Sequence, residues 1–234
     1  LDHSGSAHPY RPWALTVQAW IAAAAGDRAA VERAILGGAR VEAEVAVRRW
    51  VAGDRAGIAA AVENAHLETL AIAALLHDIG RIRQDAARGA VCHAAVGAEM
   101  ARDVLARFDL PRGMSENVCH CVLTHRYRNS HAPETVEAKC LFDADKLDAI
   151  GAVGIARAYL FAGEVGAVLH NGEIDPEDAR PYTRDDTGYR EYWVKLRTIK
   201  DRMLTGEGRR LARGRHEFME AFFDRFLREI EGVI

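Results

Sequence analysis

The sequence predicts an all-α protein, and three observations support this fold class. Apolar residues recur every three or four positions along nearly the whole chain, which is the period of an amphipathic helix. No run alternates apolar and polar residues between turn residues, as a half-buried strand does. The breaks in the helical pattern fall at helix-ending residues, namely Gly26, Gly37, Gly53, Gly89, Pro111 and Pro133.

In chain order, the pattern predicts a series of helices and one long loop. The helices span residues 13–25, 28–37, 41–52, 56–64, 66–78, 91–108, 114–127, 134–148, 150–162, 187–204 and 207–231. The loop at 169–188 holds two prolines and several acidic residues, and its length is typical of a lid or a disordered excursion. In the last helix, Phe218, Phe222, Phe226 and Ile230 share one face. That face indicates core or a dimer surface, so a homodimer is one expectation.

The composition restricts the class of partner. The chain has 234 residues, is 49% hydrophobic and 28% charged, and carries a net charge of −3. These values suit one large globular domain, or one domain with a helical appendage, and they give no basic excess for a nucleic-acid partner. No apolar run reaches the roughly 18 residues of a membrane span, and the first residues lack the pattern of a signal peptide. We therefore expect a cytoplasmic protein without a membrane partner.

The four cysteines lie within helical patterns, at positions 92, 119, 121 and 140. This placement differs from the loop-rich frame of a disulfide-stapled protein, so reduced thiols are expected. The CHC segment at 119–121 lacks the CxxC spacing of a metal site, and adjacent helical positions point in different directions. Core cysteines are the favoured interpretation.

A carboxylate ends an apolar helical run in the segment LLHDIGR at 75–81. Asp78 falls on the stripe formed by Leu67, Leu70, Ala71, Ala74 and Leu75. Its side chain is expected to face inward, with His77 one step round the helix. A buried carboxylate is costly unless another group pairs with it, so Asp78 requires a partner.

Histidines and acids occupy the apolar side of three further predicted helices. His93 begins one apolar stripe, His125 ends another, and Asp145 and Asp148 share the apolar face of a third. A single histidine in such a position is usually a satisfied core residue. Five polar groups in such positions indicate a site for a hard or borderline divalent metal ion, which would stabilise Asp78 as an anion.

The ordered set of motifs resembles the HD-domain metal-dependent phosphohydrolases, and more narrowly an uncharacterised bacterial branch of them. The motifs are LLHDIGR, a histidine at 93, THRYR at 124–128, FDADKLDAIGAVGIARAYLFAG at 142–163, and the tail KLRTIKDRMLTGEGRRLARGRHEFMEAFF at 195–223. The resemblance covers roughly residues 66–231. It implies an HD-domain, PDEase-like helical bundle with a metal site in its core. That domain would span 41–234, after an N-terminal helical extension at 1–40 that matches the family poorly.

The resemblance also implies a set of ligands. His77 and Asp78 match the signature ligands, and Asp145 matches the distal ligand. His93 and His125 stand where two-metal members place their second-site histidines, with Asp78 bridging the ions. One or two divalent ions are expected, from among Mn, Mg, Fe, Zn, Co and Ni.

One position departs from the family pattern. The family's first ligand is a histidine about thirty residues before the HD pair, and the matching position here is Val45. Glu44 is the expected replacement, with Glu42 as an alternative, because carboxylate oxygens suit magnesium or manganese. His3 or His8 could also reach the site from the N-terminal segment.

The resemblance implies a phosphohydrolase in which metal-activated water attacks phosphorus of a phosphorylated small molecule or nucleotide. The candidate cations for stabilising charge on phosphate are Arg81, Arg126, Arg128 and Lys146. Each of them is also consistent with a solvated surface charge or salt bridge. Asp148 is expected to orient a ligand, or to cap a neighbouring chain, and Asp143 is expected to be exposed.

Two other interpretations stay open. The chain could be a degenerate HD domain that binds a nucleotide or a partner without turnover, and the missing first histidine supports that reading. It could also be a helical interaction protein that dimerises through 207–231. Alarmone hydrolases and cyclic-dinucleotide phosphodiesterases are disfavoured, because the acidic pair after HD and the GYP element are absent. Oxygen-activating di-iron chemistry remains an alternative for the two extra histidines.

Overall fold

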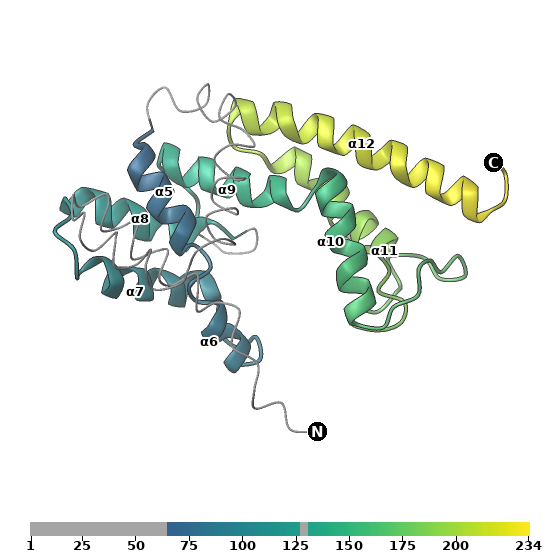
Figure 1. Cartoon of the computed structure of the whole chain (residues 1–234), viewed down its shortest axis with the longest axis horizontal. Helices are drawn as coiled ribbons and strands as arrows, with labels where there is room; N and C mark the ends of the chain where they lie inside the picture. The colour runs from purple at the N-terminus through teal and green to yellow at the C-terminus, as the bar shows by residue number, and fades with distance from the viewer. Residues whose placement is uncertain (1–64, 127–130) are drawn as a thin grey trace, which may run out of the picture. The chain divides into compact units, whose positions relative to one another are not determined.

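The computed structural model describes residues 65–126 and 131–234, and its secondary structure is helical throughout (Figure 1). The helices are α5 (Leu67–Leu76), α6 (Arg81–Ala86), α7 (His93–Leu105), α8 (Arg112–Thr124), α9 (Val136–Asp148), α10 (Gly151–Glu164), α11 (Gly188–Val194) and α12 (Gly206–Ile230), with a 3-10 helix η1 (Leu196–Arg202). No strand occurs in these residues, which confirms the all-α prediction. The helices expected before residue 65, and the boundary at 40–41, lie outside the described residues.

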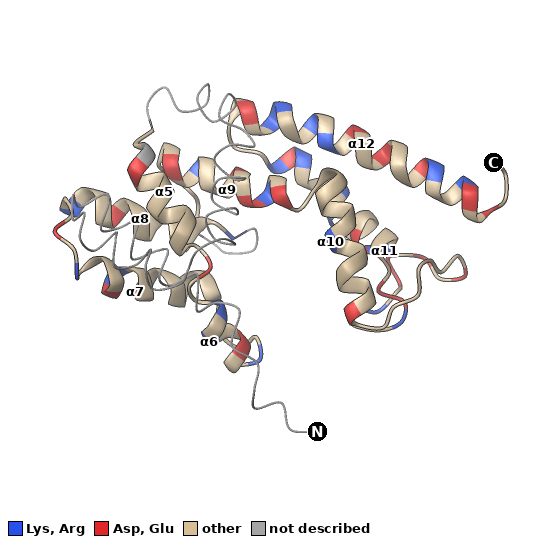
Figure 2. Ribbon diagram, viewed as in Figure 1, with Lys and Arg blue, Asp and Glu red and all other residues tan. Residues whose placement is uncertain are grey.

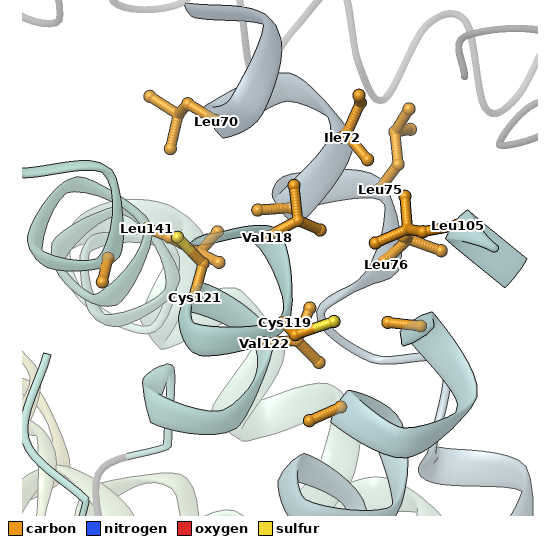
Figure 3. Close-up of a cluster of buried hydrophobic side chains, with 14 residues drawn as sticks. Leu70, Ile72, Leu75, Leu76, Leu105, Val118, Cys119, Cys121, Val122 and Leu141 are labelled. Atoms are coloured by element: carbon orange, nitrogen blue, oxygen red, sulfur yellow. The ribbon is translucent and has the colours of Figure 1, made fainter. Parts of the chain in front are cut away.

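The chain divides into two units, Leu1–Leu141 and Phe142–Ile234, called here the first and the second unit. In the first unit, α8 lies between α5 and α7 (Figure 1). Figure 3 shows the core that these helices share. Its members include Leu70, Ile72, Leu75 and Leu76 of α5, Leu105 of α7, Val118, Cys119, Cys121 and Val122 of α8, and Leu141 of α9. Cys119 and Cys121 are buried free thiols, as predicted.

A buried carboxylate joins three helices of the first unit at one end. Glu137, in the first turn of α9, accepts a hydrogen bond from the backbone N–H of His66 at 2.6 Å. It also accepts one from the side-chain amide of Asn117 on α8 at 3.0 Å. Burial raises the pKa of Glu137, but these hydrogen bonds outweigh that effect and lower it. The start of α5 is therefore fixed against α8 and α9.

The core of the second unit is formed by α10, α11, η1 and α12. Its largest fully buried side chains are Ile150 and Met219, and Phe223 of α12 stacks on Tyr192 of α11 with ring centroids 4.3 Å apart. Figure 2 shows acidic and basic residues alternating along α12. No helix in the described parts of the chain combines the length and the apolar character that membrane crossing requires.

The structure corrects the expectation that Asp143 is exposed. Asp143 is only 3% exposed. Its carboxylate accepts hydrogen bonds from the backbone N–H groups of Leu204 and Thr205, both at 2.8 Å, and from the Thr205 hydroxyl at 2.7 Å. Thr205 in turn caps α12 through the backbone N–H of Gly208. Asp143 therefore fixes the start of the last helix.

Three details of the helix prediction differ in the structure. The expected helix at 187–204 is two elements, because Lys195 leaves the helical conformation with φ −139° and ψ −58°. The phenylalanine stripe of α12 is core only in part: Phe222 and Phe226 pack against the core, whereas Phe218 is 49% exposed, and the buried residues include Ala212, His216, Met219 and Phe223. The short helix α6 was not predicted at all.

The long irregular segment connects α10 to α11 through residues 165–187. It contains its own hydrogen bonds, from Val168 N to Arg184 O at 2.9 Å and from Asn171 Nδ2 to Asp185 Oδ1 at 2.8 Å. Arg190 closes the segment by pairing with Asp186 at 2.8 Å and donating to Ala179 O at 2.8 Å. These contacts define a folded loop rather than a disordered excursion.

Candidate metal centre

The HD pair lies just beyond the end of a helix, not within it. Helix α5 ends at Leu76, His77 is its C-cap, and Asp78 stands in the turn that leads to Gly80. The expectation that Asp78 continues the helical stripe was therefore wrong. In this turn the two side chains point toward each other, because His77 Nε2 lies 3.6 Å from Asp78 Oδ2.

Two of the three histidine rings are oriented by the carbonyl groups at helix ends. His77 Nδ1 lies 2.7 Å from Ala74 O, and His125, the C-cap of α8, places Nδ1 2.6 Å from Val122 O. A carbonyl oxygen only accepts hydrogen bonds, so each ring must donate from Nδ1. In the neutral ring, Nε2 then carries the lone pair.

The third ring belongs to His93, the first residue of α7, and a side chain orients it. Gln84 Oε1 lies 2.8 Å from His93 Nδ1 and 3.2 Å from the His93 backbone nitrogen. Gln84 was missed in the sequence, since one glutamine in a short polar segment gives no pattern that distinguishes it from a surface residue.

The site brings three candidate ligand atoms together. His93 Nε2 and His125 Nε2 are 3.1 Å apart, and Asp78 Oδ1 is 3.4 Å from the first and 3.6 Å from the second. Both histidines are buried, and together with Asp78 they form a group that could hold a metal ion. Asp78 Oδ1 is itself buried and accepts no hydrogen bond from any residue that the structure describes.

These separations suit ligands of one ion. Metal–nitrogen bonds of about 2.0–2.1 Å place two ligand atoms about 3.3 Å apart on a tetrahedral ion and about 2.9 Å apart on an octahedral one. The three measured separations lie close to these values. Imidazole nitrogens and a carboxylate oxygen form a donor set that suits Mn, Fe, Co, Ni and Zn. The residues present therefore fit a divalent metal ion.

The charge state of the group also suits a cation. Burial raises the pKa of the Asp78 carboxyl, but its interactions with His125, His77 and Arg81 outweigh this effect and hold the pKa well below its usual range. Burial, together with the nearby charge of Arg81, lowers the pKa of His93 to about 4. Near neutral pH the site therefore presents an ionised carboxylate beside the neutral imidazole of His93.

A close approach of two backbones brings α7 to the HD turn. A Cβ atom on Gly80 would lie 2.1 Å from His93 O and 2.7 Å from the backbone nitrogen of Gly97, so only glycine fits there. Gly97 in turn faces Val122 of α8, whose side chain would be 3.3 Å from an added Cβ. The glycines allow His93 to reach Asp78.

Three of the four predicted cations lie among the described residues, and each of them has a partner. Arg81 donates from Nε to Asp78 Oδ2 at 2.7 Å, and Arg126 Nη1 lies 3.3 Å from Cys92 Sγ, beside His93. In the second unit, Lys146 pairs with Asp145 at 2.6 Å, and Asp148 pairs with Arg157. Glu44 and Arg128 lie outside the described residues.

The first unit also has a groove of about 670 Å³ between α7 and α8. Its lining is mostly apolar and includes Phe108 and Leu123, with Arg102 among the polar residues. Neither Asp78 nor the candidate histidines line this groove, so it is separate from the candidate metal centre.

Known proteins resemble this chain over most of its length. The HD domain family model matches residues 49–150. The uncharacterized protein YpgQ of Bacillus subtilis is 33% identical over 176 residues, which cover 73% of this chain and 77% of that protein.

Solved structures agree with this family. The crystal structure of B. subtilis YpgQ has a TM-score of 0.62 at 26% identity, covering 95% of this chain and 97% of that one. YpgQ in complex with ADP has a TM-score of 0.55 at 29% identity over 81% and 98%. An HD-superfamily hydrolase from Bacillus thuringiensis has a TM-score of 0.57 at 26% identity over 79% and 93%. Together with the convergent histidines and Asp78, these similarities establish that the chain belongs to the HD-domain superfamily.

Proposed function

We propose that this protein is a metal-dependent phosphohydrolase that acts on a phosphorylated small molecule, most naturally a nucleotide. Asp78, His93 and His125 would hold the divalent ion, with His77 beside them. One observation carries the proposal. The buried Asp78 Oδ1 accepts no hydrogen bond from the described residues, and two histidine Nε2 atoms lie within 3.6 Å of it. Arg81 already pairs with Oδ2, and a divalent ion between Oδ1 and the two imidazole nitrogens would satisfy the remaining oxygen.

A divalent ion at such a site supplies an acidified water ligand and neutralises charge on a phosphate group. The protein's own residues prepare the site for it. Arg81 holds Asp78 Oδ2, so Oδ1 keeps its orientation toward the histidines. Arg126 stays next to His93 through its contact with Cys92, and it would add positive charge where phosphate oxygens gather.

The relatives support the substrate class. YpgQ has been crystallised in complex with ADP, and the B. thuringiensis protein carries the description of an HD-superfamily hydrolase. A nucleotide carries phosphate groups whose negative charge a divalent ion would bind and neutralise. The proposal therefore extends to nucleoside phosphates.

Metal analysis of the purified protein, followed by phosphate release from a panel of nucleotides and sugar phosphates with added Mn²⁺, tests the proposal. We expect a bound divalent ion and turnover of at least one phosphate ester, both lost in Asp78→Ala. A protein that contains no metal, stays inert with Mn²⁺ and still binds nucleotide would identify the non-catalytic alternative instead.

Asp145 and Glu44 complete the proposed ligand set and need their own test. Asp145→Ala and Glu44→Ala are each expected to weaken metal binding, measured by titration of the metal-free protein. Asp201→Ala, an exposed aspartate of the second unit, is the matched control. Wild-type metal affinity in either of the two test variants would remove that residue from the set.

A further inference from the structure

We propose that Gln84 is a positioning residue for the metal centre, which holds the His93 ring with its Nε2 lone pair toward Asp78 and His125. This inference rests on the proposed metal site. It assigns a role to a residue outside the ligand set, on a helix that contributes no ligand of its own.

The three candidate histidines differ in whether their own helix supplies a carbonyl oxygen to accept the Nδ1 hydrogen. His77 and His125 follow the last turns of α5 and α8, where the final carbonyl groups lack intrahelical partners. Each ring uses the carbonyl three residues earlier, Ala74 O or Val122 O. These two rings are therefore oriented by their own helices.

His93 has no such carbonyl, because it is the first residue of α7. The groups without intrahelical partners at this end are N–H donors, and a donor cannot accept a hydrogen bond from the ring. An acceptor must come from another element, and Gln84 of α6 supplies it at 2.8 Å from Nδ1.

The orientation of the Gln84 amide is fixed by the backbone. The same Gln84 atom lies 3.2 Å from the backbone nitrogen of His93, which can only donate. That atom must therefore be the carbonyl oxygen, so the ring nitrogen facing it must also be a donor. A hydrogen on Nδ1 leaves Nε2 of the neutral ring with a lone pair.

Gln84 also replaces a missing helix cap. The N-cap residue of α7 is Cys92, whose side chain makes no capping hydrogen bond. Gln84 Oε1 accepts the first backbone N–H of the helix and the ring hydrogen of the same residue. One oxygen thus fixes both the start of α7 and the rotation of the ring.

Loss of the Gln84 carbonyl oxygen is expected to change which nitrogen of the His93 ring carries the hydrogen, while the fold is retained. Without an acceptor at Nδ1, the hydrogen is free to occupy Nε2, and a ring with Nε2–H presents a donor where a cation needs a lone pair. Outer partners of metal-binding histidines typically contribute about 10–100-fold in metal affinity. We expect a loss of that size in Gln84→Leu.

The test compares Gln84→Leu with Gln84→Glu and with Arg83→Leu, an exposed control on the same helix. Nitrogen-15 NMR of the metal-free proteins reports the His93 tautomer, and calorimetric titration with Mn²⁺ and with Zn²⁺ reports affinity. We expect Gln84→Leu to move the hydrogen to Nε2 and to weaken both metals about 10–100-fold. The glutamate keeps the acceptor and should retain the wild-type tautomer and affinity within a few fold, as should Arg83→Leu.

Two outcomes would overturn the assignment. One is a wild-type His93 tautomer in Gln84→Leu, and the other is equal loss of affinity in the leucine and glutamate variants. Gln84→Asn, one methylene too short to reach the ring, carries the same expectation if the leucine variant does not fold. The NMR arm needs no metal. A wild-type protein that binds neither metal would therefore refute the proposed function while the tautomer still decides the role of Gln84.

Discussion

His93 and His125 face each other through their Nε2 atoms at a distance of 3.1 Å, although both rings donate from Nδ1. Asp78 Oδ1 lies within 3.6 Å of both of these nitrogen atoms. A divalent ion bound by these three atoms would join helices α7 and α8 to the turn that carries Asp78.

The first prediction concerns thermal stability. Added Mn²⁺ should raise the melting temperature of the metal-free protein, because an ion that binds only the folded state stabilises it by about 2.7 kcal/mol at one hundred times its Kd. Calorimetry with and without a chelator measures the shift. His131→Gln, which removes an exposed histidine of the first unit, should keep the full shift. His125→Gln should lose most of it.

The second prediction concerns the carboxylate. Asp78→Ala should lower metal affinity by more than about 100-fold, beyond the range typical of outer partners, with little change in helix content. The metal-free variant should melt below the wild-type temperature at neutral pH, because Arg81 loses its carboxylate partner and the lowered pKa of Asp78 means that the folded state stabilises this anion. Metal stoichiometry and circular dichroism check this. An unchanged stoichiometry would exclude Asp78 as a ligand.

The third prediction concerns acid sensitivity of the metal-free protein. The folded pKa of His93 is about 4, below the unfolded value near 6.5, so the unfolded state binds more protons between these values. The contribution of His93 is therefore present above about pH 6.5 and is lost as the pH falls toward 4, by at most about 1.4 kcal/mol per pH unit. Urea unfolding at several pH values measures the slope. His93→Gln should flatten it, and an unchanged slope would contradict this account.

The fourth prediction concerns backbone packing at the HD turn. Gly80→Ala forces a Cβ atom against His93 O and should cost about 1–3 kcal/mol in unfolding free energy, with a parallel loss of metal affinity. Gly113→Ala on α8 meets no atom within 4 Å, and it should stabilise the protein by up to about 1 kcal/mol. Denaturant unfolding of both variants measures the change in unfolding free energy. It decides whether backbone contact or helix propensity determines the effect of alanine at position 80.

The sequence predicted the fold class and most helices because apolar periodicity and glycine or proline breaks are local signals. It also selected His93, His125 and Asp78, since each interrupts an apolar pattern. The predicted positions of helix ends were less accurate. No helix-ending residue lies next to Leu76 to indicate the end of α5, and the turn at 77–80 depends on the contact between Gly80 and α7.

Only part of the phenylalanine stripe of α12 packs against the core, and the reason is geometric. Residues spaced by four advance about 40° per step round a helix of 3.6 residues per turn, so the stripe drifts away from any fixed face. Phe222 and Phe226 still pack against the core, whereas Phe218 and Ile230 are 49% and 45% exposed. Gln84 and Asp143 could not be identified because their partners, His93 and Thr205, are set by tertiary packing.

In the DAD segment at 143–145, the first aspartate has a structural role. The Asp143 carboxylate accepts hydrogen bonds from three donors at the start of the C-terminal helix. A variant at position 143 that loses activity would do so because the C-terminal helix loses the hydrogen bonds that fix its first residues. Mutagenesis of this triplet must therefore pair every activity measurement with a measure of folding before an acid is credited with catalysis.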